Sequence, residues 1–414
     1  MKDAFREDPV GSLMALALVA WALFQPVAPG PAVGAALTLL GLYLVNLARR
    51  RAPFGTPGRL VAALAAALVL ATVFAPEPAP AVGFALKYWH FALVPAVAAI
   101  PASAFLRFRK ALAACGALSL ALALLAGLGD LLFRWNFKWD VLSRHGSDRD
   151  REMVYGFFSH HMTFAGFVAV VAFSLAGVAF FDRDARARRN AGLASAAAGL
   201  LLLAARKRAY WIGGGVGLLL LAVRLRTRRA LALVVAVAFL FVAGYAGSAD
   251  VRDRVQRAFQ TEDNQQRVGF WIVGWQMAKD RPLLGWGPGG YRLHGEPYLS
   301  RVFATRGGAE GYRDNFTHVH DVYLQLLVEG GVVLLAAYLA LLGWILARTG
   351  RDWWARGSPG SAEAWGAGVF TMLATLSLAG VFEWNVMDKE VGIPMMVSMG
   401  IYLLLKDQPA PATS

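Results

Sequence analysis

Three consecutive basic residues, Arg206, Lys207 and Arg208, stand between two apolar stretches with almost no loop to separate them. Cations crowded in this way repel one another, and a bound anion would relieve that repulsion. The planar guanidinium of arginine suits a phosphate because it donates two parallel hydrogen bonds. Arg267, just before an amphipathic pattern, is a second candidate of this kind. The alternatives are snorkelling of the first three side chains to lipid headgroups and a plain solvated loop charge at Arg267.

Two histidines, His318 and His320, precede a long apolar stretch and are candidates for acid–base chemistry. Residues i and i+2 of a helix point in nearly opposite directions, so we expect only one of them to face a given site unless the turn is extended. This spacing, without obvious third and fourth ligands, argues against a zinc site. Histidine titrates near neutral pH and can take a proton from a hydroxyl. The alternative is a histidine that only hydrogen-bonds a loop carbonyl.

Other polar residues are weaker candidates. Asp148 and Asp150 have a spacing that can hold a metal ion, but the arginines around them offer ion-pair partners, so we expect no metal there. Glu329 lies in an apolar stretch beside two glycines, and facing lipid would be costly, so we expect it to face the bundle interior. Whether it forms a structural hydrogen bond or a substrate contact is open. His294 has no patterned neighbours and is interpreted as a solvated loop residue.

The chain that positions these residues consists largely of long apolar blocks. Of its 414 residues, 57% are hydrophobic and 16% charged, which is more apolar than ordinary soluble proteins. A helix needs about 20 apolar residues to cross about 30 Å of hydrocarbon. The pattern predicts an all-α polytopic membrane protein with about twelve transmembrane helices in one membrane domain, residues 1–414. The predicted spans are 10–27, 31–47, 60–74, 82–105, 111–132, 158–181, 191–205, 209–223, 230–246, 322–346, 365–382 and 391–405.

The orientation follows from the short loops, because retained Lys and Arg mark the cytoplasmic side. Basic clusters fall in every second connection, at 49–51, 107–110, 183–189, 224–229 and 348–356. Both termini are therefore expected in the cytoplasm, and the loops 133–157 and 249–321 outside. The net charge of +14 is explained in large part by this rule, so no nucleic-acid partner is predicted. The first apolar block follows mixed charges and is interpreted as a retained helix, not a signal peptide.

The loop 249–321, between the ninth and tenth spans, carries ten Lys and Arg. Basic residues in excess on the outer face favour anionic lipid or phosphate as a partner. Val268, Trp271, Ile272 and Trp275 recur at i, i+3, i+4 and i+7, which predicts an amphipathic helix on the membrane surface. The glycine-rich run 285–290 predicts turns and lacks the ending of a nucleotide P-loop.

Together these motifs resemble the O-antigen ligase and polymerase family of bacterial envelope membrane proteins. The resemblance covers roughly residues 191–346. The motifs are Arg208-Ala209-Tyr210-Trp211, Arg267 with Trp271, Pro282-Leu283-Leu284-Gly285-Trp286-Gly287, and His318-Val319-His320-Asp321 followed by Glu329-Gly330. Two positions depart from the usual pattern: family members often have Asn where this chain has Asp321, and a small or hydroxyl residue where it has Lys207. Which of the two hairpin arginines acts therefore stays open.

The resemblance implies an inverting, metal-independent glycosyltransferase that needs no cofactor, with a glycosyltransferase C-like fold and a large periplasmic loop containing short helices. It would act in the bacterial inner membrane, at the periplasmic face, in lipopolysaccharide biosynthesis. The donor would be an undecaprenyl-diphosphate-linked glycan, and the acceptor a sugar hydroxyl of lipid A-core. Membrane lipids would be the remaining partners.

The resemblance also implies roles for individual residues. Arg208 and Arg267 would hold the diphosphate, and His320 would position or deprotonate the acceptor hydroxyl. Asp321 would set the tautomer of His320 or cap the helix that follows. The further residues expected at the substrate site are Arg206, Lys207, His318, Trp271 and Tyr323.

Two other functions compete with the ligase. An O-antigen polymerase uses the same donor but takes a second lipid-linked glycan as acceptor. A lipid-linked glycan transporter would place ionisable groups near the membrane midplane, often in related halves. Here most charges lie at the outer rim and no internal repeat is visible, which favours an enzyme.

Overall fold

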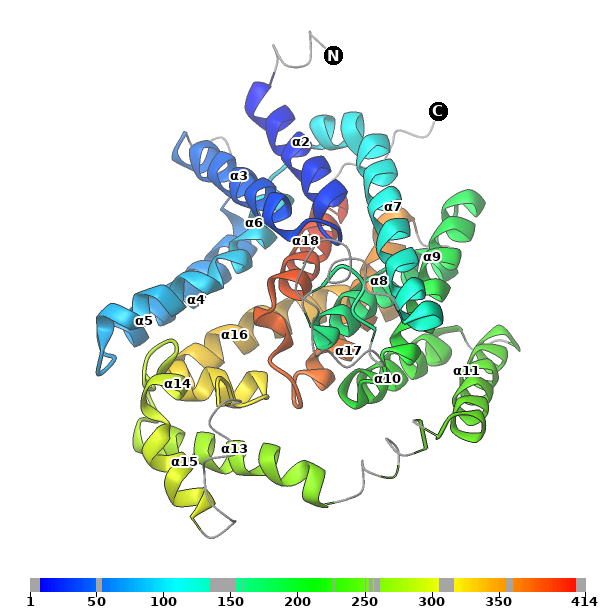
Figure 1. The fold of residues 1–414 in the computed structure, drawn as a ribbon. Coiled ribbons are helices and arrows are strands. Elements are labelled where there is room, and N and C mark those ends of the chain that lie inside the picture. The colour runs from blue at the N-terminus through cyan, green and yellow to red at the C-terminus, as the bar shows by residue number, and fades with distance from the viewer. Residues whose placement is uncertain are drawn as a thin grey trace.

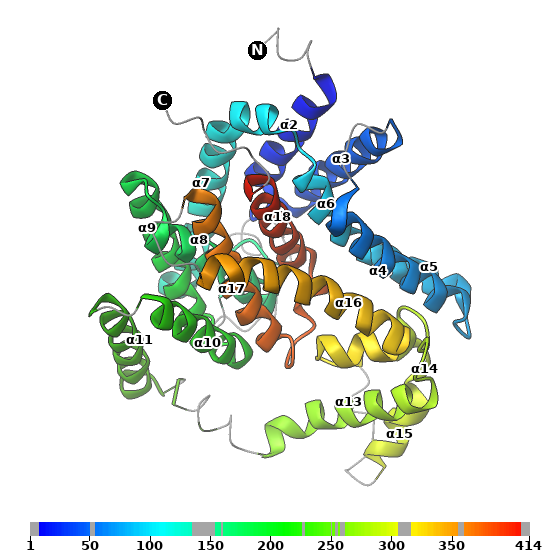
Figure 2. The same ribbon diagram turned by 180° about the vertical axis from the view of Figure 1, so that it is seen from behind.

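The computed structural model describes residues 8–49, 54–134, 154–158, 160–225, 228–249, 251–252, 256, 261–304, 316–354 and 360–406. These residues are 84% helical and contain no β-strand (Figures 1 and 2). The helices are α2 (Pro9–Phe24), α3 (Pro29–Ala48), α4 (Gly55–Val73), α5 (Pro78–Ala85), η1 (Leu86–Ala92), α6 (Leu93–Ala98), α7 (Ala102–Phe133), α8 (His161–Phe181), α9 (Ala185–Ala204), α10 (Arg208–Leu225), α11 (Arg228–Gly247), α13 (Thr261–Asp280), α14 (Gly290–His294), α15 (Glu296–Phe303), α16 (Val322–Trp354), α17 (Ser361–Ala379), η4 (Asn385–Met387) and α18 (Lys389–Lys406).

The protein is an all-helical, multi-pass membrane protein. Each of the twelve predicted spans falls on helical structure. Eight helical segments of the described chain are long and apolar enough to cross a membrane: Pro29–Ala48, Gly55–Val73, Pro78–Ala98, Ala102–Phe133, His161–Phe181, Arg208–Leu225, Val322–Trp354 and Ser361–Ala379. Pro9–Phe24 is apolar but shorter. The count of twelve crossings therefore stays a prediction.

The predicted span 82–105 is not one helix. It is divided into α5, the 3₁₀ segment η1 and α6, and α7 begins before that span ends. Pro95 explains the break, because its ring clashes with the carbonyl four residues earlier and it has no N–H to donate. The break turns Tyr88 and His90 into the core, where both are buried.

The predicted span 322–346 also differs from the expected single straight helix. Within α16, Gly331 has φ 61° and ψ −163°, which divides the helix in two. The chain reverses there, so the rings of Tyr323 and Tyr338 are 6.4 Å apart between centroids. The turn 282–287 packs into this bend: Trp286 donates its backbone N–H to Val328 at 2.8 Å, and Val332 donates to Pro282 at 2.8 Å. A Cβ on Gly331 would lie 2.2 Å from the carbonyl oxygen of Leu283.

Helices α8, α10 and α17 pack through small residues, as is common between membrane helices. A Cβ on Gly177 would lie 2.3 Å from the carbonyl oxygen of Ala364, and one on Gly213 would lie 2.4 Å from that of Thr375. These contacts bring the first turn of α10 to the end of α17 that leads into residues 380–388. Figure 1 shows α10 beside α17 at this end.

The loop between α11 and α16 contains helices, as expected, although α13 is not short. Helices α13, α14 and α15 lie together at one end of the molecule (Figures 1 and 2). They surround a second apolar core that includes Phe270, Met277, Tyr291 and Phe303. The predicted stripe of α13 faces mainly outward: Val268 is 39% exposed and Trp275 53%. The helix is therefore apolar on two faces, and its surface position at the membrane stays a prediction.

Candidate functional site

His318 and His320 meet at one place, contrary to the expectation from helical spacing. His320 has a left-handed backbone with φ 59°, so residues 318–320 do not continue the helix. The two ring centroids are 4.1 Å apart. The ring of Phe270, from α13, stacks on His320 at 6.1 Å with an interplanar angle of 12°. An extended turn was the alternative that the sequence left open; the turn is non-helical, and the left-handed backbone at His320 is what brings the two rings together.

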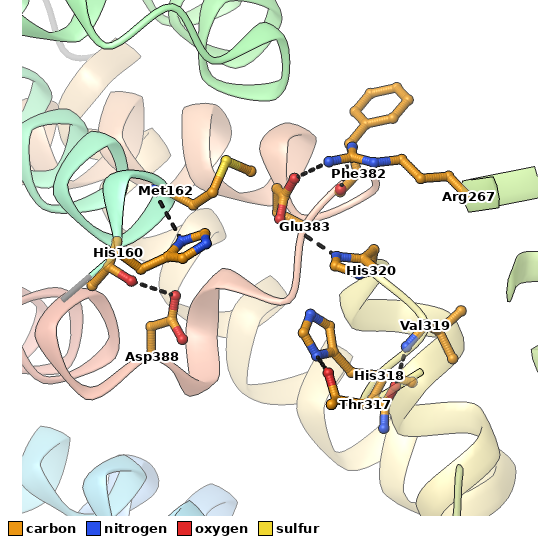
Figure 3. Close-up of polar contacts among 12 residues, drawn as sticks. His160, Met162, Arg267, Thr317, His318, Val319, His320, Phe382, Glu383 and Asp388 are labelled. Atoms are coloured by element: carbon orange, nitrogen blue, oxygen red, sulfur yellow. Dashed lines mark hydrogen bonds and ion pairs between the residues drawn. The ribbon is translucent and has the colours of Figure 1, made fainter. Parts of the chain in front are cut away.

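Glu383, in the connection after α17, joins Arg267 to His320 (Figure 3). Nη2 of Arg267 donates to Oε1 of Glu383 at 2.6 Å, and Nη1 donates to the carbonyl of Phe382 at 3.0 Å. Nδ1 of His320 lies 3.8 Å from Oε2 of the same carboxylate. Burial raises the pKa of Glu383, but the nearby His320 and Arg267 outweigh burial and lower it overall. The carboxylate is therefore ionised at neutral pH.

His318 is held neutral. Burial lowers its pKa to about 3, and the neighbouring His320, Arg267 and His160 act in the same direction. Its Nδ1 lies 2.8 Å from the hydroxyl oxygen of Thr317. His318 can therefore shape the site and accept or donate one hydrogen bond, but it does not carry positive charge at neutral pH.

His160 and Asp388 form the opposite side of the cluster. Figure 3 shows the rings of His160, His318 and His320 and the carboxylate of Glu383 turned toward one another. Nδ1 of His160 accepts the backbone N–H of Met162 at 3.2 Å, which leaves the proton of the neutral ring on Nε2. Oδ2 of Asp388 accepts the Thr163 hydroxyl at 3.2 Å. Burial, with the charges of Glu390 and Glu383, raises the pKa of Asp388 to about 7.

The basic turn between α9 and α10 lies at the same end of the bundle. Arg206 takes a left-handed conformation with φ 54°, Lys207 is buried, and Arg208 is the first residue of α10. Within the first turn of α10, the side chain of Tyr210 is within electrostatic range of Glu383 and Asp388. Tyr210 thus links the helix that follows the basic turn to the cluster that contains Arg267 and the histidine pair.

Comparison with known proteins identifies the segment that carries most of these residues. Residues 193–339 match the sequence model of a family described as O-antigen ligase. The resemblance to this family is thereby confirmed. A search of curated proteins found no match.

The matched O-antigen ligase segment contains every site residue that the sequence proposed. Besides Arg267 and the two histidines, Asp321, Tyr323 and Trp271 make contacts that fix their positions. Asp321 accepts the backbone N–H of Leu324 at 2.8 Å and so caps α16, which was one of its two expected roles. Tyr323 donates to the carbonyl of Ser377 at 2.8 Å and ties α16 to α17. Trp271 lies 6.2 Å from the ring of Phe382, close to the Arg267 contact.

Glu329 faces the interior, as expected, and its contacts lie within the fold. Its carboxylate accepts the Tyr88 hydroxyl at 2.6 Å, the Gln325 amide at 2.8 Å and the backbone N–H of Gly289 at 2.9 Å. These bonds join η1, α16 and the glycine-rich turn of the O-antigen ligase segment. Glu329 therefore has a structural role in holding the α16 bend.

His294 was wrongly interpreted as solvated. Its side chain is 15% exposed, stacks near Trp286 at 5.5 Å and lies 4.0 Å from Glu77. Trp286 and Glu77 are close to His294 in space but not adjacent to it in sequence, so the sequence pattern did not reveal these contacts. Asp148 and Asp150 lie outside the described residues. Within the described ranges no group of three or more His, Cys, Asp or Glu could hold a metal ion.

The sequence did not indicate His160, Glu383 or Asp388, and all three lie outside the matched O-antigen ligase segment. One signal was available for two of them. The connection 380–388 between two apolar helices is short, yet it contains two acidic residues. Carboxylates in such a connection are forced to the membrane boundary or into the protein, where they need partners.

Proposed function

We propose that the protein is an O-antigen ligase that transfers a glycan from undecaprenyl diphosphate to a sugar hydroxyl of lipid A-core. The observation that carries this proposal is the placement of Arg267 and His320 on the two oxygens of one buried carboxylate, Glu383. An anion-binding group and a proton acceptor are thereby fixed side by side. Both come from the segment that matches the O-antigen ligase family.

The donor diphosphate would lie against Arg267 and Arg208. The side chain of Arg267 is 34% exposed, so it is accessible to a ligand. Arg208 begins α10 at the same end of the bundle. Positive charge held in advance at this place stabilises the negative charge that develops on the leaving diphosphate.

The acceptor hydroxyl would lie at Nε2 of His320, because Nδ1 faces Glu383. The hydroxyl oxygen attacks the anomeric carbon, and its proton passes to Nε2. The bond between the anomeric carbon and the diphosphate oxygen breaks, and its electron pair leaves with the diphosphate. A single in-line displacement inverts the anomeric configuration. His318 is neutral, so it adds no positive charge to the site.

The polyprenyl tail has an apolar groove available between α4 and the α5–η1 segment. The groove has a volume of about 470 Å³ and includes Leu68, Val73, Leu86 and Trp89 in its lining. Tyr88 also lines it and donates to Glu329, which lies two turns beyond the start of α16. The groove is thus tied to the helix that follows His320. The proposal places the reaction at the periplasmic face of the inner membrane, with both termini cytoplasmic.

Transfer by purified protein in detergent or nanodiscs tests the proposal. Wild type, His320→Ala and the control His294→Ala would receive undecaprenyl-diphosphate glycan together with lipid A-core. The expected result is glycan on lipid A-core with wild type and His294→Ala, and its loss with His320→Ala. Lengthening of the lipid-linked glycan would instead identify a polymerase. Movement of intact donor across vesicles without any transfer would indicate a transporter.

A further inference from the structure

Glu383 makes two unequal contacts. Its Oε1 accepts a hydrogen bond of 2.6 Å from Arg267, whereas its Oε2 is 3.8 Å from Nδ1 of His320, beyond hydrogen-bond distance. Nδ1 of His320 is buried and has no hydrogen-bond partner among the described residues. Burying a ring nitrogen without a partner is unfavourable, and the nearest acceptor is the carboxylate that Arg267 occupies.

A bound diphosphate would compete with Phe382 and Glu383 for the N–H donors of Arg267. Nη1 and Nη2 of Arg267 are both engaged, one by Phe382 and the other by Glu383. A phosphate that takes one N–H from each of Nη1 and Nη2 in a bidentate way competes with this contact and displaces it. The Arg267 side chain is 34% exposed and so accessible to a ligand, whereas the Glu383 side chain is only 8% exposed.

We propose that Glu383 is a positioning residue with two successive partners. In the resting protein it holds Arg267, and once the donor diphosphate binds it accepts a hydrogen bond from His320. This inference rests on the proposed function. As Arg267 moves to the diphosphate, Oε2 closes on Nδ1–H of His320 and fixes the tautomer that leaves Nε2 free. The proton from the acceptor hydroxyl then enters a ring whose positive charge faces Glu383. Donor binding thereby orients His320 to accept the proton, so the donor binds before the acceptor hydroxyl is activated.

The other charged groups around His320 do not replace Glu383. His318 is neutral, Asp321 is bound to the first turn of α16, and Asp388 lies on the His160 side. Phe270 covers one face of the His320 ring. Loss of Glu383 therefore leaves His320 without its carboxylate while releasing Arg267.

Glu383→Gln separates the two roles. Undecaprenyl diphosphate without glycan serves as the binding probe for protein in nanodiscs, and transfer is measured at saturating donor. We expect the probe to bind about threefold to tenfold tighter than to wild type, because Arg267 no longer has an ionic partner to give up. We expect kcat to fall by about 10²-fold or more, the usual contribution of a general base. Glu383→Asp keeps the charge and should recover part of kcat.

Two controls keep the test decisive. Asp388→Asn removes a half-buried carboxylate of the same cluster that has no contact with Arg267 among the described residues, so probe affinity should stay within about twofold. In an Arg267→Gln background, Glu383→Gln should no longer tighten binding. Weaker or unchanged probe binding in Glu383→Gln, together with lower kcat, would show a fixed structural role and overturn the inference, leaving the proposed function intact. Absence of probe binding to wild type would overturn both.

Discussion

At the scale of single residues, the guanidinium of Arg267 is defined by two directed contacts, one to a carboxylate and one to a backbone carbonyl. A lysine could keep the charge at this position but not the fork of parallel donors. We expect Arg267→Lys to lower kcat/KM for glycan transfer by about 10- to 100-fold, equivalent to about 1.4 to 2.7 kcal/mol. Arg292→Lys, at an exposed position in the same loop, is the matched control. Wild-type turnover by Arg267→Lys would contradict bidentate binding.

His318 makes stability depend on pH. Its pKa is about 3 in the folded protein, against an ordinary value of 6.5, so between these values the unfolded chain binds a proton that the folded protein does not. Folding stability should therefore decrease as the pH falls below about 6.5, by up to about 1.4 kcal/mol per pH unit. Thermal unfolding of wild type and His318→Gln, compared between about pH 7.5 and about pH 5, checks this dependence of stability on pH. Parallel loss of stability in both proteins would exclude His318 as the cause.

At the scale of elements, the bend in α16 sets where His320 and Asp321 lie relative to the membrane helices. Gly331 adopts φ 61°, and a Cβ there would collide with backbone atoms of the turn 282–287. We expect Gly331→Ala to destabilise the protein by on the order of 3 kcal/mol. Gly343→Ala, in the same helix with open space around it, should be neutral or slightly stabilising. Equal effects of the two substitutions on thermal unfolding would argue against a tightly packed bend.

Helix caps and breaks explain why the site lies at element ends. His160 caps α8, Asp321 caps α16, and Asp388 precedes α18. Glu383 lies in the short connection between α17 and η4. Connections at the end of a bundle can place polar groups from distant parts of the chain side by side without placing them in the hydrocarbon. The packed helices hold the connections in place, and the polar side chains of the candidate site lie mainly in these connections.

At the scale of the whole molecule, the positive-inside pattern predicts which side carries the site. Cys115 is the only cysteine in the chain, so a Cys115→Ser background allows single labels. Glu296→Cys, at an exposed position of α15, should react with a membrane-impermeant maleimide added to intact spheroplasts. Arg186→Cys, exposed at the start of α9, should react only after the membrane is permeabilised. The reverse pattern would invert the topology and place the site in the cytoplasm.

The amino-acid sequence by itself determined the helices and the basic and histidine-bearing segments. Apolar length and local charge are properties of contiguous residues, so the spans, the hairpin 206–208, Arg267 and His320 could be found without a fold. The interior orientation of Glu329 followed in the same way, because an isolated carboxylate in an apolar stretch needs internal partners.

Only the tertiary structure decided which carboxylate serves the histidine. Asp321 is adjacent to His320 in sequence, yet its side chain caps α16, and the carboxylate that reaches His320 is Glu383 after the next helix. The pairing depends on a left-handed backbone at His320, on the bend at Gly331 and on packing between α10, α16 and α17. These are long-range contacts whose energies come from burial and shape complementarity, which local sequence patterns do not encode.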